Sequence, residues 1–205
     1  MDGTLIDSAE YHWLTWRDTF AGLDVPLTEA EFRGWFGSRN DRILKQYFPA
    51  IAPADIARIG DEKETRYRAM VRDRGITLLP GVGEWLERLH AAGWRQAVAS
   101  SAPPANIEVL VEVLHLGPLL DAMVSAEEVA HGKPAPDVFL RAADKLGVAP
   151  GRSVVVEDAA VGVEAGRRGG MRTIGIGSPE RLDADVVTAS MADLPPDTFD
   201  RLVPA

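Results

Sequence analysis

The chain of 205 residues carries 31 acidic and 22 basic residues, has a formal net charge of −9 and contains no cysteine. This charge argues against nucleic acid as the main partner, because a phosphate backbone requires a basic surface. The lack of cysteine excludes disulfides and thiolate chemistry. No apolar run is long enough to span a bilayer and no signal peptide opens the sequence, so we expect a cytoplasmic protein with no membrane partner.

From Ala9 to Gly75 the sequence has the pattern of helices alone. Apolar residues recur at helical spacing, and Thr28 with Glu31 forms a capping box at the start of one helix. No strand is expected in this stretch. We therefore predict an all-helical domain over residues 10–77, inserted into a core domain that consists of residues 1–9 and 78–205.

After Pro80 short apolar strands alternate with amphipathic helices. The expected strands cover residues 96–99, 122–124, 153–156 and 173–176. Residues 153–156 are apolar on both faces, which is typical of a strand in a parallel sheet covered by helices. The alternation predicts an α/β fold with a doubly wound, Rossmann-like parallel sheet.

Polar residues lie where these strands end, and ligands of open α/β sheets bind outside the carboxyl ends of the strands. Together with the start of the chain, these residues are Asp2, Gly3, Thr4, Ser100, Ser101, Lys133, Glu157 and Asp158. Carboxylates, a lysine and hydroxyl groups at one edge of a sheet are the groups that hold a phosphate together with a divalent cation.

Each of these groups also has a purely structural interpretation, and the residues alone leave both open. Glu157 and Asp158 repel each other unless a cation such as Mg²⁺ joins them, but Asp158 also suits a helix cap with Glu157 in solvent. Ser100 could either form part of an anion site or cap the N-terminus of the following helix. Lys133 lies in a loop stiffened by Pro134, and it could either bind a phosphate or be an ordinary exposed lysine on the surface.

Taken in order, Asp2–Ser8, Ser100, Lys133–Asp137 and the Glu157–Asp158 pair resemble the four motifs of the haloacid dehalogenase (HAD) superfamily of hydrolases. The resemblance spans nearly the whole chain. It implies a HAD-type core domain with an inserted all-helical cap domain. Within the superfamily the chain is most similar to the beta-phosphoglucomutase-like phosphatases, as the segments 8–12, 132–137 and 177–182 indicate.

This resemblance implies Mg²⁺-dependent phosphoryl transfer. Asp2 would be the general acid/base, with its backbone carbonyl on the metal. Ser100, with the N–H of Ser101, would hold the phosphoryl group, and Lys133 would balance its charge. The metal would be held by Glu157–Asp158.

Further substrate contacts follow from the same resemblance. Gly3 and Thr4 would line the phosphate site, and His12 would position Asp2 or the substrate, although a histidine on a helix face is an equally ordinary interpretation. Arg39 and Asn40 in the predicted cap would contribute to specificity.

One motif is incomplete. In the superfamily the nucleophile is an aspartate two positions before the acid/base, at the end of a central strand, and Asp2 occupies the acid/base position. Losing about five buried strand residues would cost roughly 10 kcal/mol, which is the stability of a typical domain. We therefore expect the native chain to begin upstream of Met1 with an apolar run that ends in aspartate.

These observations predict a phosphatase of small phosphorylated metabolites, sugar phosphates among them, that forms an aspartyl-phosphate. One alternative is a beta-phosphoglucomutase-type hexose-phosphate mutase, which the lack of basic residues at Asn40 and at 102–104 disfavours. The other is an inactive remnant that binds metal and phosphate esters. The sequence leaves the oligomeric state open, with a monomer favoured.

Overall fold

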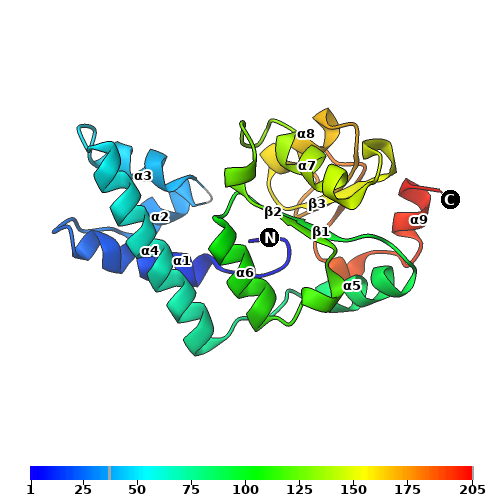
Figure 1. The fold of residues 1–205 in the computed structure, drawn as a ribbon, viewed down its shortest axis with the longest axis horizontal. Helices are drawn as coiled ribbons and strands as arrows, with labels where there is room; N and C mark the ends of the chain where they lie inside the picture. The colour runs from blue at the N-terminus through cyan, green and yellow to red at the C-terminus, as the bar shows by residue number, and fades with distance from the viewer. Residues whose placement is uncertain (37, 205) are drawn as a thin grey trace. The chain divides into compact units, whose positions relative to one another are not determined.

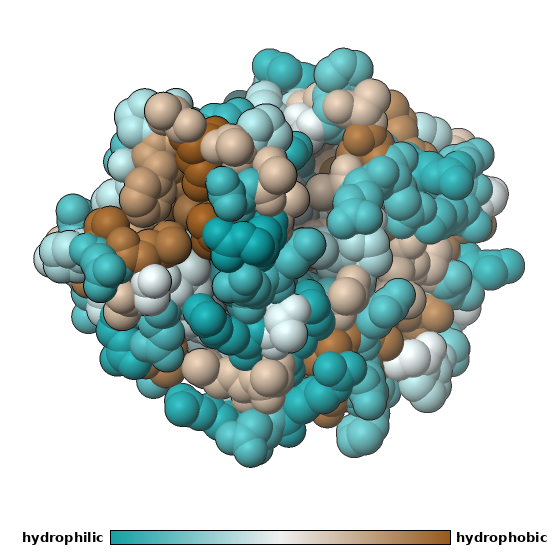
Figure 2. All heavy atoms as spheres, turned by 60° about the vertical axis from the view of Figure 1, so that its left-hand side comes forward, coloured by the Kyte–Doolittle hydropathy of each residue, from teal (hydrophilic) through white to brown (hydrophobic). Residues whose placement is uncertain are grey.

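The computed structural model describes residues 1–36 and 38–204, and the chain divides into two compact units. Unit 1 consists of Met1–Asp7 and Ile76–Ala205, and unit 2 is Ser8–Gly75. Within the described ranges, no helix combines the length and the apolar character needed to cross a membrane. Hydrophilic residues cover much of the face seen in Figure 2, with hydrophobic residues in separate patches between them.

Unit 2 is built from helices, as the sequence predicts (Figure 1). They are α1 (Ala9–Ala21), α2 (Glu29–Trp35), α3 (Asn40–Tyr47) and α4 (Pro53–Arg74). The predicted capping box is confirmed, because Thr28 accepts from the backbone N–H of Glu31 and donates its own N–H to the Glu31 carboxylate.

The core of unit 2 is largely aromatic. Its fully packed residues are Trp16, Phe20, Phe32, Trp35, Ile43, Leu44 and Ile59. The two ends of the unit are joined as well, since the hydroxyl of Tyr11 in α1 donates to the carbonyl of Gly75, just after α4, at 2.5 Å. Unit 2 is therefore closed on itself at the point where the chain enters and leaves it.

Unit 1 contains parallel strands, which confirms the α/β class. They are β1 (Ala97–Ala99), β2 (Ala122–Val124), β3 (Val154–Glu157), β4 (Arg172–Ile176) and β5 (Val186–Thr188). β1 pairs with β2, and β4 lies between β3 and β5. The sheet is thus in two pieces, whereas a single sheet was expected.

Helices cover both faces of these strands. They are α5 (Val82–Ala91), α6 (Pro104–Val113), α7 (Asp137–Leu146), α8 (Ala160–Arg168) and α9 (Thr198–Leu202). α7 packs on β1 and β2 and α8 on β3 and β4, around Val124, Phe139 and Val155. On the other face, α5 and α9 enclose Ile174 with Trp85 and Phe199.

Two local expectations differ from the structure. β5 was not predicted, because its three residues are only half-buried and show no alternation of apolar and polar side chains. The interpretation of Asp158 as a helix cap is wrong: α8 begins after Ala159 without a side-chain cap, and Asp158 accepts a hydrogen bond from Thr4 instead.

Candidate active site

The first residues of the chain form a tight loop. Leu5 donates its N–H to the carbonyl of Met1 at 2.7 Å, and Gly3 donates to that of Ile6 at 2.8 Å. Gly3 has φ = +71°, a left-handed conformation that glycine adopts without steric cost. The loop is joined to the chain after unit 2, because Leu79 donates to the carbonyl of Leu5 at 2.8 Å.

This loop lies against Asp158, directly after β3. The hydroxyl of Thr4, which is 5% exposed, donates to Asp158 Oδ1 at 2.9 Å. A side chain at Gly3 would meet the same carboxylate, since an ideal Cβ there would lie 2.0 Å from Asp158 Oδ2. Only glycine therefore allows the loop to approach this closely.

The carboxyl group of Asp158 is held in an environment that disfavours its charge. Burial raises its pKa above the ordinary value of 3.8, the hydrogen bond from Thr4 opposes this effect, and the neighbouring Glu157 carboxylate adds to it.

Glu157, the last residue of β3, is 5% exposed and forms an ion pair with Lys133. The ammonium group of Lys133 also lies 4.8 Å from the centre of the Phe139 ring, a cation–π contact. The loop between β2 and α7 thus places its lysine at the carboxyl end of β3, where a phosphate site was predicted.

The Glu157 carboxylate rests on the first turn of α8. An ideal Cβ at Gly162 would lie 2.2 Å from Glu157 Cδ, so a glycine is required where the helix passes beneath this side chain. The backbone N–H of Ala159 donates weakly to Glu157 Oε2, at 3.4 Å. The carboxylate is therefore fixed from three sides, by Lys133, Ala159 and Gly162.

Ser100 directly follows β1 and is 5% exposed. Its Oγ accepts from the N–H of Ala102 at 3.1 Å, and its own N–H donates to Val124 of β2. Among the described residues the Ser100 hydroxyl donates to none, so its hydrogen is available to another acceptor. Ser101 is exposed, and α6 begins at Pro104 without a side-chain cap, so the alternative of an ordinary helix cap at Ser100 is wrong.

The donor set for a metal ion is small. Within residues 1–36 and 38–204, no three histidine or acidic side chains are grouped closely enough to hold a metal ion by themselves. Mg²⁺ needs only one or two carboxylates when water and substrate oxygens complete its shell. Asp158, whose charged form is disfavoured by burial, fits that requirement better than Glu157, which Lys133 already neutralises.

The remaining predicted residues lie in unit 2. His12 Nδ1 is 2.8 Å from Lys63 Nζ, and its ring is stacked on Tyr67. Arg39 is exposed and bonds Asp41, whereas Asn40 donates to Glu64 Oε1 at 2.8 Å. Their roles at the phosphate site stay predictions.

Lys63 was missed by the sequence reasoning. It is 1% exposed, although it lies in a charged stretch of α4, and it donates to Glu64 at 2.9 Å as well as contacting His12. Its spacing offered a signal: Lys63 is four residues from both Ile59 and Tyr67, which are buried on the same helix face.

Comparison with known proteins agrees with this geometry. The sequence profile of the family described as haloacid dehalogenase-like hydrolase matches residues 1–176. The chain belongs to this family. The matched range includes Asp2, Ser100, Lys133, Glu157 and Asp158, so the predicted HAD-type hydrolase is confirmed at the level of the family.

The relatives of this HAD-type hydrolase include both phosphatases and mutases. It is 32% identical to fructose-1-phosphate phosphatase YqaB of Escherichia coli over 179 residues, which cover 86% of this chain and 93% of the relative. It is 30% identical to beta-phosphoglucomutase of Bacillus subtilis over 203 residues, 95% and 88% of the two chains.

A solved structure shows the same fold. The crystal structure of CbbY from Rhodobacter sphaeroides in complex with phosphate superposes with a TM-score of 0.86 at 29% identity, over 95% of this chain and 93% of that one. The predicted α/β fold of the HAD type is thereby confirmed.

Proposed function

We propose that the chain is a Mg²⁺-dependent phosphatase of small phosphorylated metabolites, sugar phosphates among them, and that it forms an aspartyl-phosphate intermediate. The observation that carries this proposal is the meeting of Thr4, Lys133, Glu157 and Asp158 at the carboxyl end of β3. The half-buried lysine, together with a cation held by the carboxylates, can offset the negative charge of a phosphate ester.

In the proposed reaction a carboxylate oxygen attacks phosphorus and the bond from phosphorus to the ester oxygen breaks. Asp2 gives its proton to the leaving alkoxide and then takes a proton from the water that attacks the aspartyl-phosphate. The product is inorganic phosphate, and both carboxylates return to their starting state. The attacking carboxylate belongs to an aspartate two positions before Asp2.

The chain's own donors would hold the transferring group. The hydroxyl of Ser100, whose Oγ is fixed by the N–H of Ala102, would donate to one phosphate oxygen. Lys133 would share its charge between Glu157 and the phosphate. This arrangement explains how a chain with a net charge of −9 can bind an anionic substrate. Hydrogen-bond donors and a lysine at the site stabilise the phosphate, so the protein as a whole does not need a positive charge.

Magnesium would be held by Asp158, by the backbone carbonyl of Asp2 and by oxygens of the substrate, with Glu157 next to it. When bound, it would supply positive charge to the phosphate oxygens. Support comes from the Asp158 carboxyl group, because burial raises its pKa and a cation beside it would favour the ionised form.

The test is release of inorganic phosphate from a panel of sugar phosphates, with and without Mg²⁺, by the chain carrying an aspartate directly before Met1. Asparagine at that added position is the matched control. Phosphate release that requires both Mg²⁺ and the aspartate is expected. Equal release by the asparagine form would exclude the covalent route.

A second candidate, a hexose-phosphate mutase, is favoured by the 30% identity to beta-phosphoglucomutase of Bacillus subtilis. A mutase would give an isomerised sugar phosphate without net phosphate release and would need a bisphosphate primer. A third candidate, a remnant that binds but does not turn over, would show ligand binding without either product.

A further inference from the structure

The loop that carries Lys133 has little packing of its own. Each of the residues 131–136 is exposed or half-buried, so no side chain anchors this part of the backbone in the core. Pro134 and Pro136 each fix one φ angle, but the other backbone angles are held only by hydrogen bonds. The mobility of such a segment depends on how many contacts oppose its local opening. The direction in which Lys133 points therefore depends on the hydrogen bonds of this loop.

Asp137 closes the loop through two contacts with a single residue. The backbone N–H of His131 donates to Asp137 Oδ2 at 3.2 Å, and His131 Nδ1 lies 3.0 Å from the same oxygen. A carboxylate can only accept, so Nδ1 carries the hydrogen of this second bond. Asp137 is the first residue of α7, which gives the two bonds a rigid base. We call this pair of bonds the His131–Asp137 clamp.

Lys133 lies inside the segment that the clamp closes. Ala135 donates its N–H to the carbonyl of Gly132 at 3.0 Å, so residues 132–135 form a turn with Lys133 in its second position. This turn begins directly after His131 and ends two residues before Asp137. Opening of the clamp would release both ends of the turn and, with them, the backbone of Lys133.

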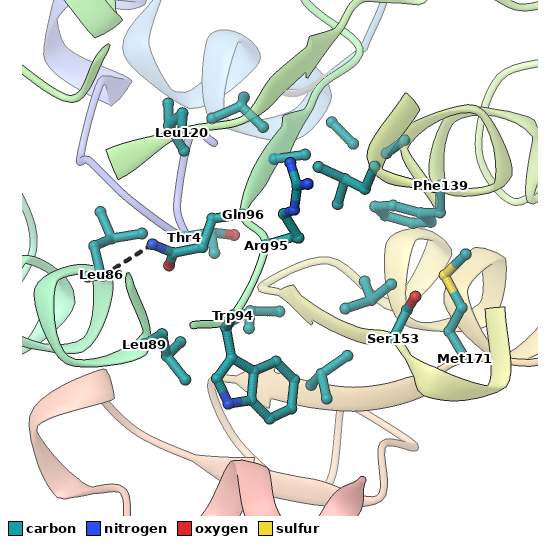
Figure 3. A pocket seen from close by; sticks show the side chains of 18 of the residues that line it. Thr4, Leu86, Leu89, Trp94, Arg95, Gln96, Leu120, Phe139, Ser153 and Met171 are labelled. Atoms are coloured by element: carbon teal, nitrogen blue, oxygen red, sulfur yellow. Dashed lines mark hydrogen bonds between the residues drawn. The ribbon is translucent and has the colours of Figure 1, made fainter. Parts of the chain in front are cut away.

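The ammonium group of Lys133 lies between two different neighbours. It forms an ion pair with Glu157 and lies 4.8 Å from the centre of the Phe139 ring. Figure 3 shows this ring pointing from α7 into an apolar cavity of about 250 Å³. Lysine carries its charge on a flexible four-carbon stem, so a fixed backbone is needed to keep that charge between the ring and the carboxylate.

We propose that His131 is a positioning residue, which acts through Asp137 to hold the ammonium group of Lys133 beside Glu157. His131 does not act on the substrate itself. It reduces the number of conformations of the loop, so that the charge of Lys133 is in place before an anion binds. The consequence for phosphate binding rests on the proposed function, in which Lys133 shares its charge with the phosphate.

Three variants test this role. His131→Leu removes the donor and keeps a side chain of similar size, whereas His131→Asn retains an N–H close to the position of Nδ1. His90→Leu is the matched control, because His90 is exposed on α5 and is not part of the clamp. Each variant is compared with the unchanged chain.

The first measurement follows Lys133 directly and depends on no activity. The acetylation rate of each lysine with acetic anhydride is determined by peptide mass spectrometry. Lys133 should react about fivefold faster in His131→Leu, a factor that corresponds to the net contribution of one hydrogen bond. In His131→Asn and His90→Leu its rate should stay within about twofold of the unchanged chain. Lys45 and Lys63 of unit 2 serve as internal references.

The second measurement is the affinity for inorganic phosphate in the presence of Mg²⁺, determined by calorimetric titration. The Kd should rise about fivefold in His131→Leu, because part of the binding free energy is then spent on ordering the loop. His131→Asn should restore the affinity of the unchanged chain, and His90→Leu should not alter it.

Equal acetylation of Lys133 in His131→Leu and in the unchanged chain would overturn the proposal, as would His131→Asn reacting as fast as His131→Leu. A further increase on adding His131→Leu to Asp137→Ala would also overturn it, because the two residues would then act independently. Faster acetylation in His131→Leu, with no phosphate binding by any form, would support the positioning role and contradict the proposed function.

Discussion

Thr4 and Asp158 are 154 positions apart in the chain, and a hydrogen bond of 2.9 Å joins their side chains. It fixes the opening loop to the carboxyl end of β3 and stabilises the ionised form of a carboxylate that burial destabilises. Without a cation beside it, the Asp158 carboxylate is destabilised by its burial, and the proposed Mg²⁺ would offset this cost.

Asp158→Asn should raise stability and remove activity. The folded-state pKa of Asp158 lies above 3.8, so the folded state binds more protons than the unfolded one, and stability falls as pH rises from 3.8 through the folded pKa. The neutral asparagine avoids that loss. Thermal unfolding at pH 7 without metal should give a higher Tm for the variant. In the form that carries an aspartate directly before Met1, Mg²⁺-dependent phosphate release should fall by about 100-fold or more. A lower Tm would contradict this prediction.

Asp185→Asn should have the opposite effect on stability. Burial raises the pKa of Asp185, but hydrogen bonds from Thr173 and Arg172 outweigh it and lower the pKa below 3.8. Asp185 therefore contributes stability above pH 3.8, which is lost as pH falls through the folded pKa. The variant should lose about 1–3 kcal/mol at pH 7 in urea unfolding. The difference should shrink under acid conditions, and a constant difference would count against the electrostatic cause.

Lys133→Met should leave the Glu157 carboxylate buried without its cation. Removing one partner of a buried pair costs about 3–5 kcal/mol. The double variant Lys133→Met/Glu157→Gln should recover most of that stability in metal-free urea unfolding, because no unpaired charge remains. In the form that carries an aspartate directly before Met1, both variants should be inactive in phosphate release. A double variant no more stable than Lys133→Met would show that the ion pair is not the cause.

Gly162→Ala should disturb the site through Glu157, since the new methyl group would lie 2.2 Å from the carboxylate carbon. Overpacking of this kind costs about 1–3 kcal/mol. Gly34→Ala in α2 is the matched control, because among the described residues no atom other than those of its chain neighbours and the nearby helix backbone lies within 4 Å of its ideal Cβ. That control should gain about 0.5–1 kcal/mol in chemical unfolding. Equal effects at both positions would contradict the contact with Glu157.

Much of the fold was predictable from local patterns. The strands β1, β2, β3 and β4 coincide with short apolar runs, and the capping box at Thr28 needed only four residues of sequence. Such features depend on neighbours along the chain, where periodicity is informative. β5 escaped prediction because its pattern is weak and its pairing with β4 is what makes it a strand.

The candidate site was likewise predictable only in part. Lys133 and Glu157 each follow a predicted strand, so both were expected at the same edge of the sheet, and the structure joins them in an ion pair. The bond between Thr4 and Asp158 could not be read from the sequence, because nothing local relates residues that far apart. Lys63 was not singled out from the sequence, although its helical spacing from Ile59 and Tyr67 places it on their buried face, and the structure shows that it is 1% exposed.

The hydrogen bond from Tyr11 to Gly75 has a consequence for protein engineering, because it bears on whether unit 2 can be replaced. Because the first and last turns of unit 2 meet at this bond, the whole unit enters and leaves through neighbouring points. A tether of a few residues could replace it, or a foreign helical module with adjacent ends could be spliced in its place. Unit 2 should therefore be replaceable as a module, and the order and connections of the strands in unit 1 would stay unchanged.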